Sequence, residues 1–213
     1  VPGQTVLRDL SFTLAPGSRT ALVGPSGSGK STVAALLVRF LDPRTGVVTL
    51  NGLDVRTLDP DAVRARVTWL AEDAYLFDTT IAANLRIARH DASEAELRAA
   101  LGRARLLDWV DALPAGLDTP VGEHGARLSG GQRRRLALAR ALLTDARVLI
   151  LDEPAEHLDD PTAHRLTRDL LEAADDRTVL LITHRTADLA GIDRVVTLGA
   201  QRLVSAGASA VRR

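Results

Sequence analysis

Cysteine and methionine are both absent from this chain of 213 residues, and aromatic residues make up only 3% of it. The lack of cysteine excludes disulfide bonds and catalysis by a thiol. No apolar run approaches the roughly 18 residues that a transmembrane helix requires, so we expect the chain itself to be soluble. Because it begins with Val1 and contains no methionine, we also expect it to be a piece of a longer polypeptide.

The charge balance bears on the class of binding partner, and the scarcity of lysine draws attention to one position. The 27 basic and 27 acidic residues cancel. A dedicated nucleic-acid-binding protein normally carries a basic surplus, so we expect no nucleic-acid partner. Arginine provides 26 of the basic residues, and Lys30 is the single lysine. A lone lysine in an arginine-rich chain suggests that its position requires lysine for a chemical reason. The alternative is that it was retained by chance at the surface.

Apolar patterning alternates between strand and helix along most of the chain. Strands are expected over residues 6–14, 19–23, 47–50, 67–70, 147–151, 178–182 and 194–198. Helices are expected over 30–40, from 93 onward, over 105–113, 130–143 and 161–173, and between the last two strands. This alternation predicts an α/β fold with a parallel sheet, as one domain over residues 1–213. Residues of approximately 73–145 are expected to form a helical insert within it.

A glycine-rich loop joins the strand at 19–23 to the first helix and matches the phosphate-loop pattern G-x-x-x-x-G-K-[ST]. Its members are Gly24, Pro25, Ser26, Gly27, Ser28, Gly29, Lys30 and Ser31. The glycines let backbone N–H groups approach phosphate oxygens, and the helix that follows adds the positive end of its dipole. Lys30 is predicted to reach the β- and γ-phosphates, and the Ser31 hydroxyl to bind Mg²⁺. Arginine cannot replace a compact ammonium group in such a loop, which explains the single lysine.

Two acidic residues, Asp152 and Glu153, follow the apolar strand at 147–151. The carboxyl end of a buried parallel strand faces the crevice where ligands bind in open α/β sheets. Asp152 is predicted to hold Mg²⁺, directly or through water, and Glu153 to orient and deprotonate an attacking water. Adjacent acids after a strand are common, and it is the phosphate loop upstream that gives this pair its functional interpretation.

A second glycine-containing segment precedes the helix expected at 130–143. It consists of Leu128, Ser129, Gly130, Gly131 and Gln132. Ser129 is a natural N-cap, and the glycines leave backbone donors exposed at a helix N-terminus, which favours anion binding. The run 133–135 that follows is three arginines, and we interpret it as a solvated helix face because the net charge is zero.

These motifs resemble, in kind and order, those of the ATP-binding cassette (ABC) nucleotide-binding domains. The phosphate loop, LSGGQ at 128–132, LILDEP at 149–154 and Thr183-His184-Arg185 carry the resemblance, which covers almost the whole chain. It implies a P-loop NTPase (RecA-like) core with an N-terminal antiparallel β subdomain and an inserted helical subdomain. It also implies ATPase activity with ATP and Mg²⁺ as ligands.

The resemblance further implies a head-to-tail dimer of two nucleotide-binding domains around two MgATP molecules. ATP on the loop from Gly24 to Thr32 of one chain would be capped by the LSGGQ segment of the other. His184 matches the family's switch histidine at the γ-phosphate and would complete a catalytic set with Lys30 and Glu153. Asp159 matches a position at which the two domains contact one another.

Four further stretches resemble exporters within this family. Segment 121–125 (VGEHG) is similar to the exporter coupling loop, and segment 76–85 (LFDTTIAANL) to a stretch near the transmembrane partner. They imply a transmembrane domain in the same parent chain and a position at the cytoplasmic face of a bacterial inner membrane. Segments 70–77 and 156–159 resemble the exporter of cysteine and glutathione linked to cytochrome bd assembly (CydC/CydD type, CydC closer).

Two departures from the family pattern stand out. Glu72 occupies the usual place of a glutamine, whose amide can bind Mg²⁺ and also touch the nucleophilic water, whereas a carboxylate only accepts hydrogen bonds. Glu72 must therefore bind metal, take up a proton or turn away, and we expect slower or differently coupled hydrolysis. The second departure is the adenine platform. Phe12 is the one aromatic residue upstream of the loop and lies in the wrong register, so the stacking residue is expected before Val1.

Two alternative functions stay open at this point. The chain could be the ATP-binding, weakly hydrolysing regulatory half of a heterodimeric transporter, which Glu72 favours and the intact Glu153 and His184 oppose. It could also be a soluble ABC-type ATPase, which the exporter-like segments disfavour. A homodimer and a heterodimer both satisfy the pattern.

Overall fold

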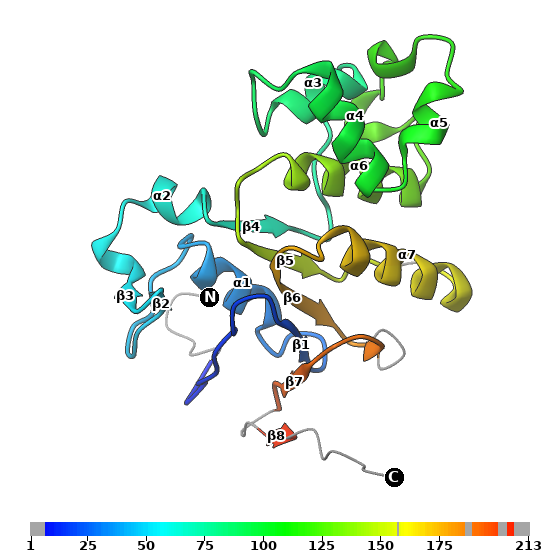
Figure 1. Ribbon diagram of the computed structural model, residues 1–213. Helices are drawn as coiled ribbons and strands as arrows, with labels where there is room; N and C mark the ends of the chain where they lie inside the picture. Colours follow the sequence, from blue (N-terminus) through cyan, green and yellow to red (C-terminus); the bar gives the residue numbers. More distant parts are fainter. Residues whose placement is uncertain (1–6, 157, 186–188, 200–203, 207–213) are drawn as a thin grey trace.

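A six-stranded sheet forms the centre of the chain (Figure 1). The computed structural model describes residues 7–156, 158–185, 189–199 and 204–206. Across the sheet the strands are β4 (Val67–Leu70), β5 (Val148–Asp152), β6 (Thr178–Thr183), β1 (Arg19–Val23), β7 (Arg194–Thr197) and β8 (Val204–Ala206). All neighbours are parallel except β7 and β8, which are antiparallel. The predicted α/β fold with a parallel sheet is confirmed.

The middle strands are apolar on both faces because helices cover each side of the sheet. On β5, Leu149 and Leu151 belong to one hydrophobic cluster and Ile150 to the other, and β6 repeats this alternation. Helix α1 (Lys30–Leu37) packs on the Ile150 side. Helices α6 (Gly130–Leu142) and α7 (Asp160–Ala173) pack on the opposite side. Strands buried on both faces are typical of parallel sheets.

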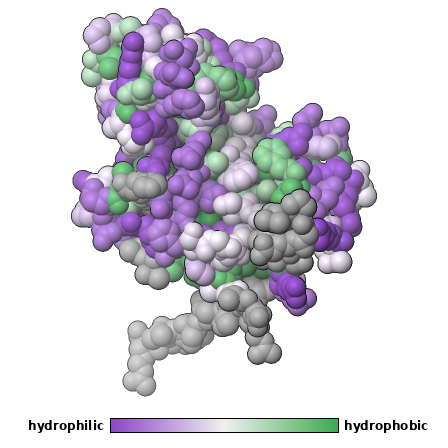
Figure 2. All heavy atoms as spheres, turned by 180° about the vertical axis from the view of Figure 1, so that it is seen from behind, coloured by the Kyte–Doolittle hydropathy of each residue, from purple (hydrophilic) through white to green (hydrophobic). Residues whose placement is uncertain are grey.

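Short helices form a lobe at one end of the sheet, at the top of Figure 1. They are α3 (Ile81–Arg86), α4 (Glu94–Arg103) and α5 (Leu107–Asp111), with the N-terminal half of α6 beneath them. Figure 2 shows this lobe from behind as a bulge above the sheet, with hydrophilic residues over much of the visible surface. None of the helices in the described part of the chain combines the length and apolar character that a bilayer-crossing helix needs.

The smaller elements complete the chain between the sheet and the lobe. A two-stranded antiparallel sheet joins β2 (Thr49–Leu50) and β3 (Leu53–Asp54), followed by helix α2 (Pro60–Arg64). Single 3₁₀ turns lie at Val55–Thr57, Gly116–Asp118 and Glu123–Gly125.

Several predicted elements differ from those observed. The strand expected over 6–14 is wrong for its described part: Asp9 has a φ of 51°, which interrupts an extended strand, although Leu7, Leu10 and Phe12 still pack on the α1-side cluster. Helix α1 ends at Leu37 rather than at 40, and Arg39 there has a φ of 55°. The helix expected between the last two strands falls partly on residues 186–188, which lie outside the described residues.

Candidate active site

The phosphate loop lies between the end of β1 and the start of α1, as predicted. Gly24 is packed so closely that a Cβ there would lie 2.6 Å from the Leu198 carbonyl oxygen and 2.8 Å from Ser28 Oγ, so only glycine fits. Gly29 is the N-cap of the helix and has a φ of 96°, in the left-handed region. Glycine is favoured there because it has no Cβ and adopts a positive φ without strain. Packing at Gly24 and backbone conformation at Gly29 therefore each favour glycine in this loop.

Lys30 lies at the start of α1 with only 8% of its surface exposed. Its Nζ donates hydrogen bonds to the carbonyl oxygens of Gly24, at 2.8 Å, and Pro25, at 3.2 Å. The same Nζ lies 3.6 Å from Glu153 Oε1. The ammonium group is thus folded back onto the loop, with donors that an incoming phosphate can take over.

The residues around the loop fit a magnesium nucleotide. Ser28 Oγ is buried and has no hydrogen-bond partner within the described part of the chain, which leaves a polar atom inside the loop for a ligand. Ser31 follows Lys30 on the first turn of α1, and its hydroxyl interacts with the carboxyl of Asp152. A hydroxyl paired with a carboxylate beside a phosphate loop is a donor set that Mg²⁺ accepts, because Mg²⁺ prefers oxygen ligands.

Asp152 is the last residue of β5 and is 5% exposed. Burial raises the pKa of its carboxyl above the ordinary value for aspartate, and the negative charges of Glu153 and Glu72 add to this rise. The Ser31 hydroxyl and the nearby indole N–H of Trp69 oppose it. A buried anion that lacks a positive partner is costly, and a bound divalent cation would remove that cost.

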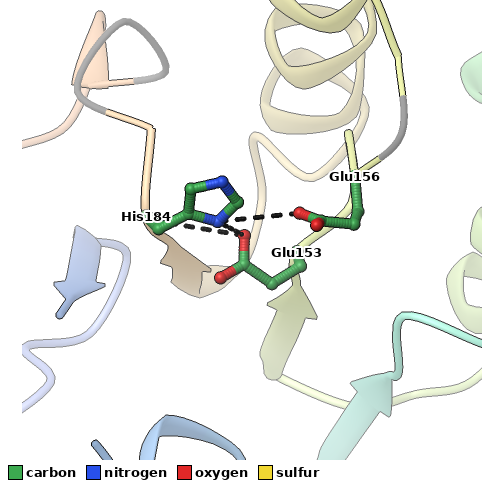
Figure 3. A group of neighbouring side chains, drawn as sticks. All are labelled: Glu153, Glu156 and His184. Atoms are coloured by element: carbon green, nitrogen blue, oxygen red, sulfur yellow. Dashed lines mark hydrogen bonds and ion pairs between the residues drawn. The ribbon is translucent and has the colours of Figure 1, made fainter. Parts of the chain in front are cut away.

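Glu153 and His184 come together because β5 and β6 are neighbours in the sheet, as Figure 3 shows. His184 Nδ1 lies 2.9 Å from Glu153 Oε2, and the His184 backbone N–H donates to the same oxygen at 3.4 Å. Glu153 itself has a φ of 43°, and its backbone N–H donates to the Ile182 carbonyl at 2.9 Å. The carboxylate is therefore held between Lys30 on one oxygen and His184 on the other.

Two charged side chains next to this pair were missed by sequence reasoning. Glu156 Oε2 lies 3.6 Å from His184 Nδ1. Arg134, which is partly buried, donates to the Glu156 backbone carbonyl at 2.7 Å, and burial lowers the pKa of its guanidinium. Nothing in the local pattern signals this contact, because Arg134 and Glu156 are far apart in the sequence.

The interpretation of the arginines at 133–135 as a solvated face is therefore wrong for two of them. Arg134 bonds as described above, and Arg135 donates to Asp169 at 2.8 Å. Arg133 is exposed and donates to the Leu128 carbonyl at 3.0 Å. The net charge of the chain could not predict these contacts, because it does not tell which charged side chains lie next to each other.

The LSGGQ segment begins α6 with a capping box. Ser129 Oγ accepts from the Gln132 backbone N–H at 3.2 Å, and Gln132 Oε1 accepts from the Ser129 N–H at 2.8 Å. Leu128 is buried below it, whereas Gly130 and Gly131 are only partly buried at the helix end. Among the described residues, no hydrogen bond or ion pair joins this segment to the phosphate loop of the same chain.

Asp159 and Glu72 occupy exposed positions near these elements. Asp159 is the N-cap of α7 and accepts a hydrogen bond from the Thr162 backbone N–H at 3.2 Å. The Thr162 side chain and this backbone N–H together lower the pKa of its carboxyl. Its role as a helix N-cap is enough to explain an aspartate at position 159. The predicted contact of Asp159 with a second domain stays a prediction. Glu72 lies in the turn after β4, where its charge acts on both Asp152 and Arg134.

Segments 76–85 and 121–125 lie side by side. The Val121 N–H donates to the Thr79 carbonyl at 2.9 Å, and the Ile81 N–H to the Thr119 carbonyl at 3.0 Å. The ring of Tyr75, directly before segment 76–85, meets that of His124 edge to face with centroids 4.5 Å apart. Segments that are separated by some forty residues thus form one surface.

A phosphate loop after β1, an acidic pair at the end of β5 and a histidine at the end of β6 define a P-loop nucleotide-binding domain. The family model described as "ABC transporter" matches residues 7–156, and the chain belongs to that family. The chain is 45% identical over 207 residues to the mitochondrial potassium channel ATP-binding subunit of Pongo abelii, covering 97% of this chain and 29% of that protein.

Two further comparisons concern exporters. The chain is 43% identical to the beta-(1→2)glucan export ATP-binding/permease protein NdvA of Rhodopseudomonas palustris, covering 94% of this chain and 33% of that protein. It is also similar to the structure of a bacterial Atm1-family ABC exporter with ATP bound, with 39% identity and a TM-score of 0.87 over 95% of this chain and 36% of that one. The chain therefore spans about a third of the length of these relatives. Together the comparisons show an ATP-binding domain of the ABC exporter type, and its residues are consistent with ATPase activity.

Proposed function

We propose that this chain binds and hydrolyses MgATP to drive export through a transmembrane domain. The observation that carries the proposal is the position of Glu153, whose two carboxylate oxygens lie beside Lys30 Nζ and His184 Nδ1 at 3.6 and 2.9 Å. This arrangement supports the proposed roles of Glu153 as general base and of Lys30 as phosphate-binding residue. Phosphate release from MgATP by the full-length protein tests it directly, and no release above the buffer control contradicts it.

The residues divide the work in a defined way. Lys30 exchanges its two loop carbonyls for phosphate oxygens, which is favourable because its ammonium group then meets negative charge. Ser31 and Asp152 would hold Mg²⁺, which supplies positive charge beside the phosphates when it is bound. Glu153 accepts the proton of the attacking water, and His184 orients the Glu153 carboxylate through its ring nitrogen. The buried ammonium group of Lys30 thereby meets the phosphates, and the buried carboxylate of Asp152 would meet the magnesium ion.

The glycines of the LSGGQ segment support a head-to-tail dimer. A Cβ on Gly131 would meet no atom of the described residues within 4 Å, and its backbone does not need a positive φ. Glycine inside a helix costs roughly 0.5–1 kcal/mol relative to alanine. No contact within the described part of the chain requires glycine there, so we infer that the open space at Gly131 serves a ligand bound to a second copy or to a related domain.

Replacement of Gly131 by alanine therefore separates folding from function. We expect Gly131→Ala to raise the thermal stability slightly, because helix propensity improves, and to lower the ATPase rate at least tenfold, because a methyl group blocks the partner's nucleotide. Gly102→Ala in α4 is the matched control. Its Cβ would lie 3.8 Å from Leu107 Cδ2, an ordinary contact, so it gains stability without loss of rate. Equal ATPase rates in the two variants would exclude the trans-acting role.

Glu72 is expected to slow hydrolysis. Its carboxylate adds negative charge near Asp152 and offers no donor to the attacking water. We expect Glu72→Gln to raise kcat several-fold, as measured by phosphate release at saturating MgATP. Asp73→Asn is the control, because Asp73 lies in the same turn and its charge also acts on Arg134. A similar increase in both variants would mean that only the charge of the turn matters, and no increase in Glu72→Gln would remove Glu72 from the mechanism.

A transmembrane partner is supported by exposed apolar side chains on the lobe. Tyr75 and Phe77 are exposed, and their rings meet edge to face with centroids 4.8 Å apart. Tyr75 also contacts His124 of segment 121–125. Exposed apolar patches mark interaction surfaces. We place the chain at the cytoplasmic face of a bacterial inner membrane, with this patch toward the membrane domain.

The cargo is a finer part of the proposal. Segments 70–77 and 156–159 favour export of cysteine or glutathione in connection with cytochrome bd assembly, whereas the relatives named above include a glucan exporter. Stimulation of the ATPase rate by cysteine or glutathione, but not by beta-(1→2)glucan, supports the thiol cargo. The reverse pattern rejects it.

A weakly hydrolysing regulatory half of a heterodimer is the second candidate function. Glu72 is the specific observation that favours it, since the carboxylate replaces the family's glutamine. A full-length protein that binds ATP yet hydrolyses it only together with a second, different chain would support that candidate over a homodimeric motor.

A further inference from the structure

Three side chains with metal-binding atoms gather at one point between β5, β6 and the loop before α7 (Figure 3). They are Glu153, Glu156 and His184, each of which offers one ligand atom within 4.8 Å of the others. His184 Nδ1 lies 2.9 Å from Glu153 Oε2 and 3.6 Å from Glu156 Oε2. All three ligand atoms therefore face the same small space.

We propose that Glu153, Glu156 and His184 form a binding site for a transition-metal dication of the Zn²⁺ type in the nucleotide-free protein. Zn²⁺ takes imidazole nitrogen and carboxylate oxygen at roughly 2.0–2.2 Å, which puts tetrahedral ligands about 3.4 Å apart. The observed separations from Nδ1 lie on either side of that value. The imidazole ligand also makes this site chemically different from the predicted Mg²⁺ position, because Mg²⁺ prefers oxygen ligands alone.

The local structure holds the ligands in place. Glu153 is fixed by its backbone bond to Ile182, and its Oε1 is turned toward Lys30, which leaves Oε2 for the cation. Arg134 binds the backbone carbonyl of Glu156, so that the loop carrying this side chain is tied to α6. The side chains of Glu156 and His184 are 28% and 49% exposed, which gives a cation direct access from solvent.

The charges nearby set the expected strength of binding. Lys30 lies 3.6 Å from the other oxygen of Glu153, and the charge of Arg134 acts on Glu156. Two positive groups beside two carboxylates weaken the attraction for a dication. We therefore expect micromolar affinity rather than the much tighter binding of a closed structural zinc site. Zn²⁺ bound at His184 Nδ1 also replaces the hydrogen bond between His184 and Glu153.

Occupation of this site has a consequence for hydrolysis, which rests on the function proposed above. A cation on Glu153 Oε2 withdraws electron density from the carboxylate and makes it a weaker acceptor for a proton from water. The same cation occupies His184 Nδ1. Micromolar Zn²⁺ is therefore expected to inhibit the ATPase, and the inhibition should weaken when MgATP is added first.

The test uses the full-length, tag-free protein without nucleotide and titrates it calorimetrically with ZnCl₂. We expect one Zn²⁺ per chain, and at least tenfold weaker binding in Glu156→Gln, which loses one ligand while Glu153 and His184 remain. Glu94→Gln is the matched control, because Glu94 lies in the first turn of α4 in the helical lobe. Thermal unfolding of both variants verifies that they fold.

Spectroscopy provides a second measurement that does not depend on activity. Co²⁺ bound to one nitrogen and two carboxylate oxygens gives a visible absorption that changes when the nitrogen is lost, so His184→Ala should alter this spectrum and Glu94→Gln should not. Unchanged Zn²⁺ affinity in both Glu156→Gln and His184→Ala would overturn the proposal. If Zn²⁺ binds as expected in a protein that hydrolyses no ATP, the metal site stands and the proposed ATPase function fails.

Discussion

Replacement of Glu153 by glutamine is expected to lower kcat for ATP hydrolysis at least a hundredfold while ATP still binds. General bases contribute about 10²–10⁴ to rate, and glutamine keeps the size of the side chain but cannot accept the proton. The carboxylate lies 2.9 Å from His184 Nδ1 and 3.6 Å from Lys30 Nζ, so no other described carboxylate is held in the same way. Phosphate release and equilibrium ATP binding, measured on the full-length protein, separate the two effects.

Glu94→Gln serves as the control for Glu153→Gln, because it makes the same chemical change at an exposed helix end. It should hydrolyse ATP at the original rate. A Glu153→Gln variant that keeps more than a tenth of the rate would mean that another group accepts the proton, and the mechanism proposed for Glu153 would have to be given up.

Replacement of Lys30 by arginine is expected to weaken ATP binding by about tenfold to a hundredfold, which corresponds to the roughly 1.5–3 kcal/mol of a charge-assisted hydrogen bond. The substitution keeps the charge, but the planar guanidinium does not fit a position that is 8% exposed and bonded to two loop carbonyls. Titration of the full-length protein with MgATP measures the change.

The reverse substitution elsewhere provides the control for Lys30→Arg. Arg98 in α4 pairs with Asp111 at 2.8 Å on the surface of the lobe, and Arg98→Lys should leave ATP affinity unchanged. If Lys30→Arg also binds ATP with the original affinity, the single lysine of this chain has no special role in the loop.

The elements predicted well are those in which the signal is contiguous. The loop from Gly24 to Ser31 and the acidic pair after β5 are runs of adjacent residues, so the chain order alone fixes which side chains are neighbours. Strand β4 and helix α6 begin and end close to the predicted bounds for the same reason. Asp152 is predicted as a metal ligand from its place at a strand end; the structure buries it beside Ser31, and the metal-binding role stays a prediction.

The features that sequence reasoning missed depend on tertiary contacts. The alternation over 6–14 is real in the sense that Leu7 and Phe12 face the core, but Asp9 takes a positive φ and prevents a strand. Glu156 meets His184 only because β5 and β6 lie next to each other, and Arg134 reaches Glu156 only because α6 packs over that loop. A periodic pattern carries no information about such pairs.

The most direct test of the account is a structure of the full-length Glu153→Gln protein determined with MgATP. We predict the γ-phosphate within hydrogen-bond distance of Lys30 Nζ in one copy and of the partner's Ser129, with Ser31 and Asp152 beside the magnesium. Nucleotide bound away from Lys30, or covered on both sides by residues of a single chain, would contradict it.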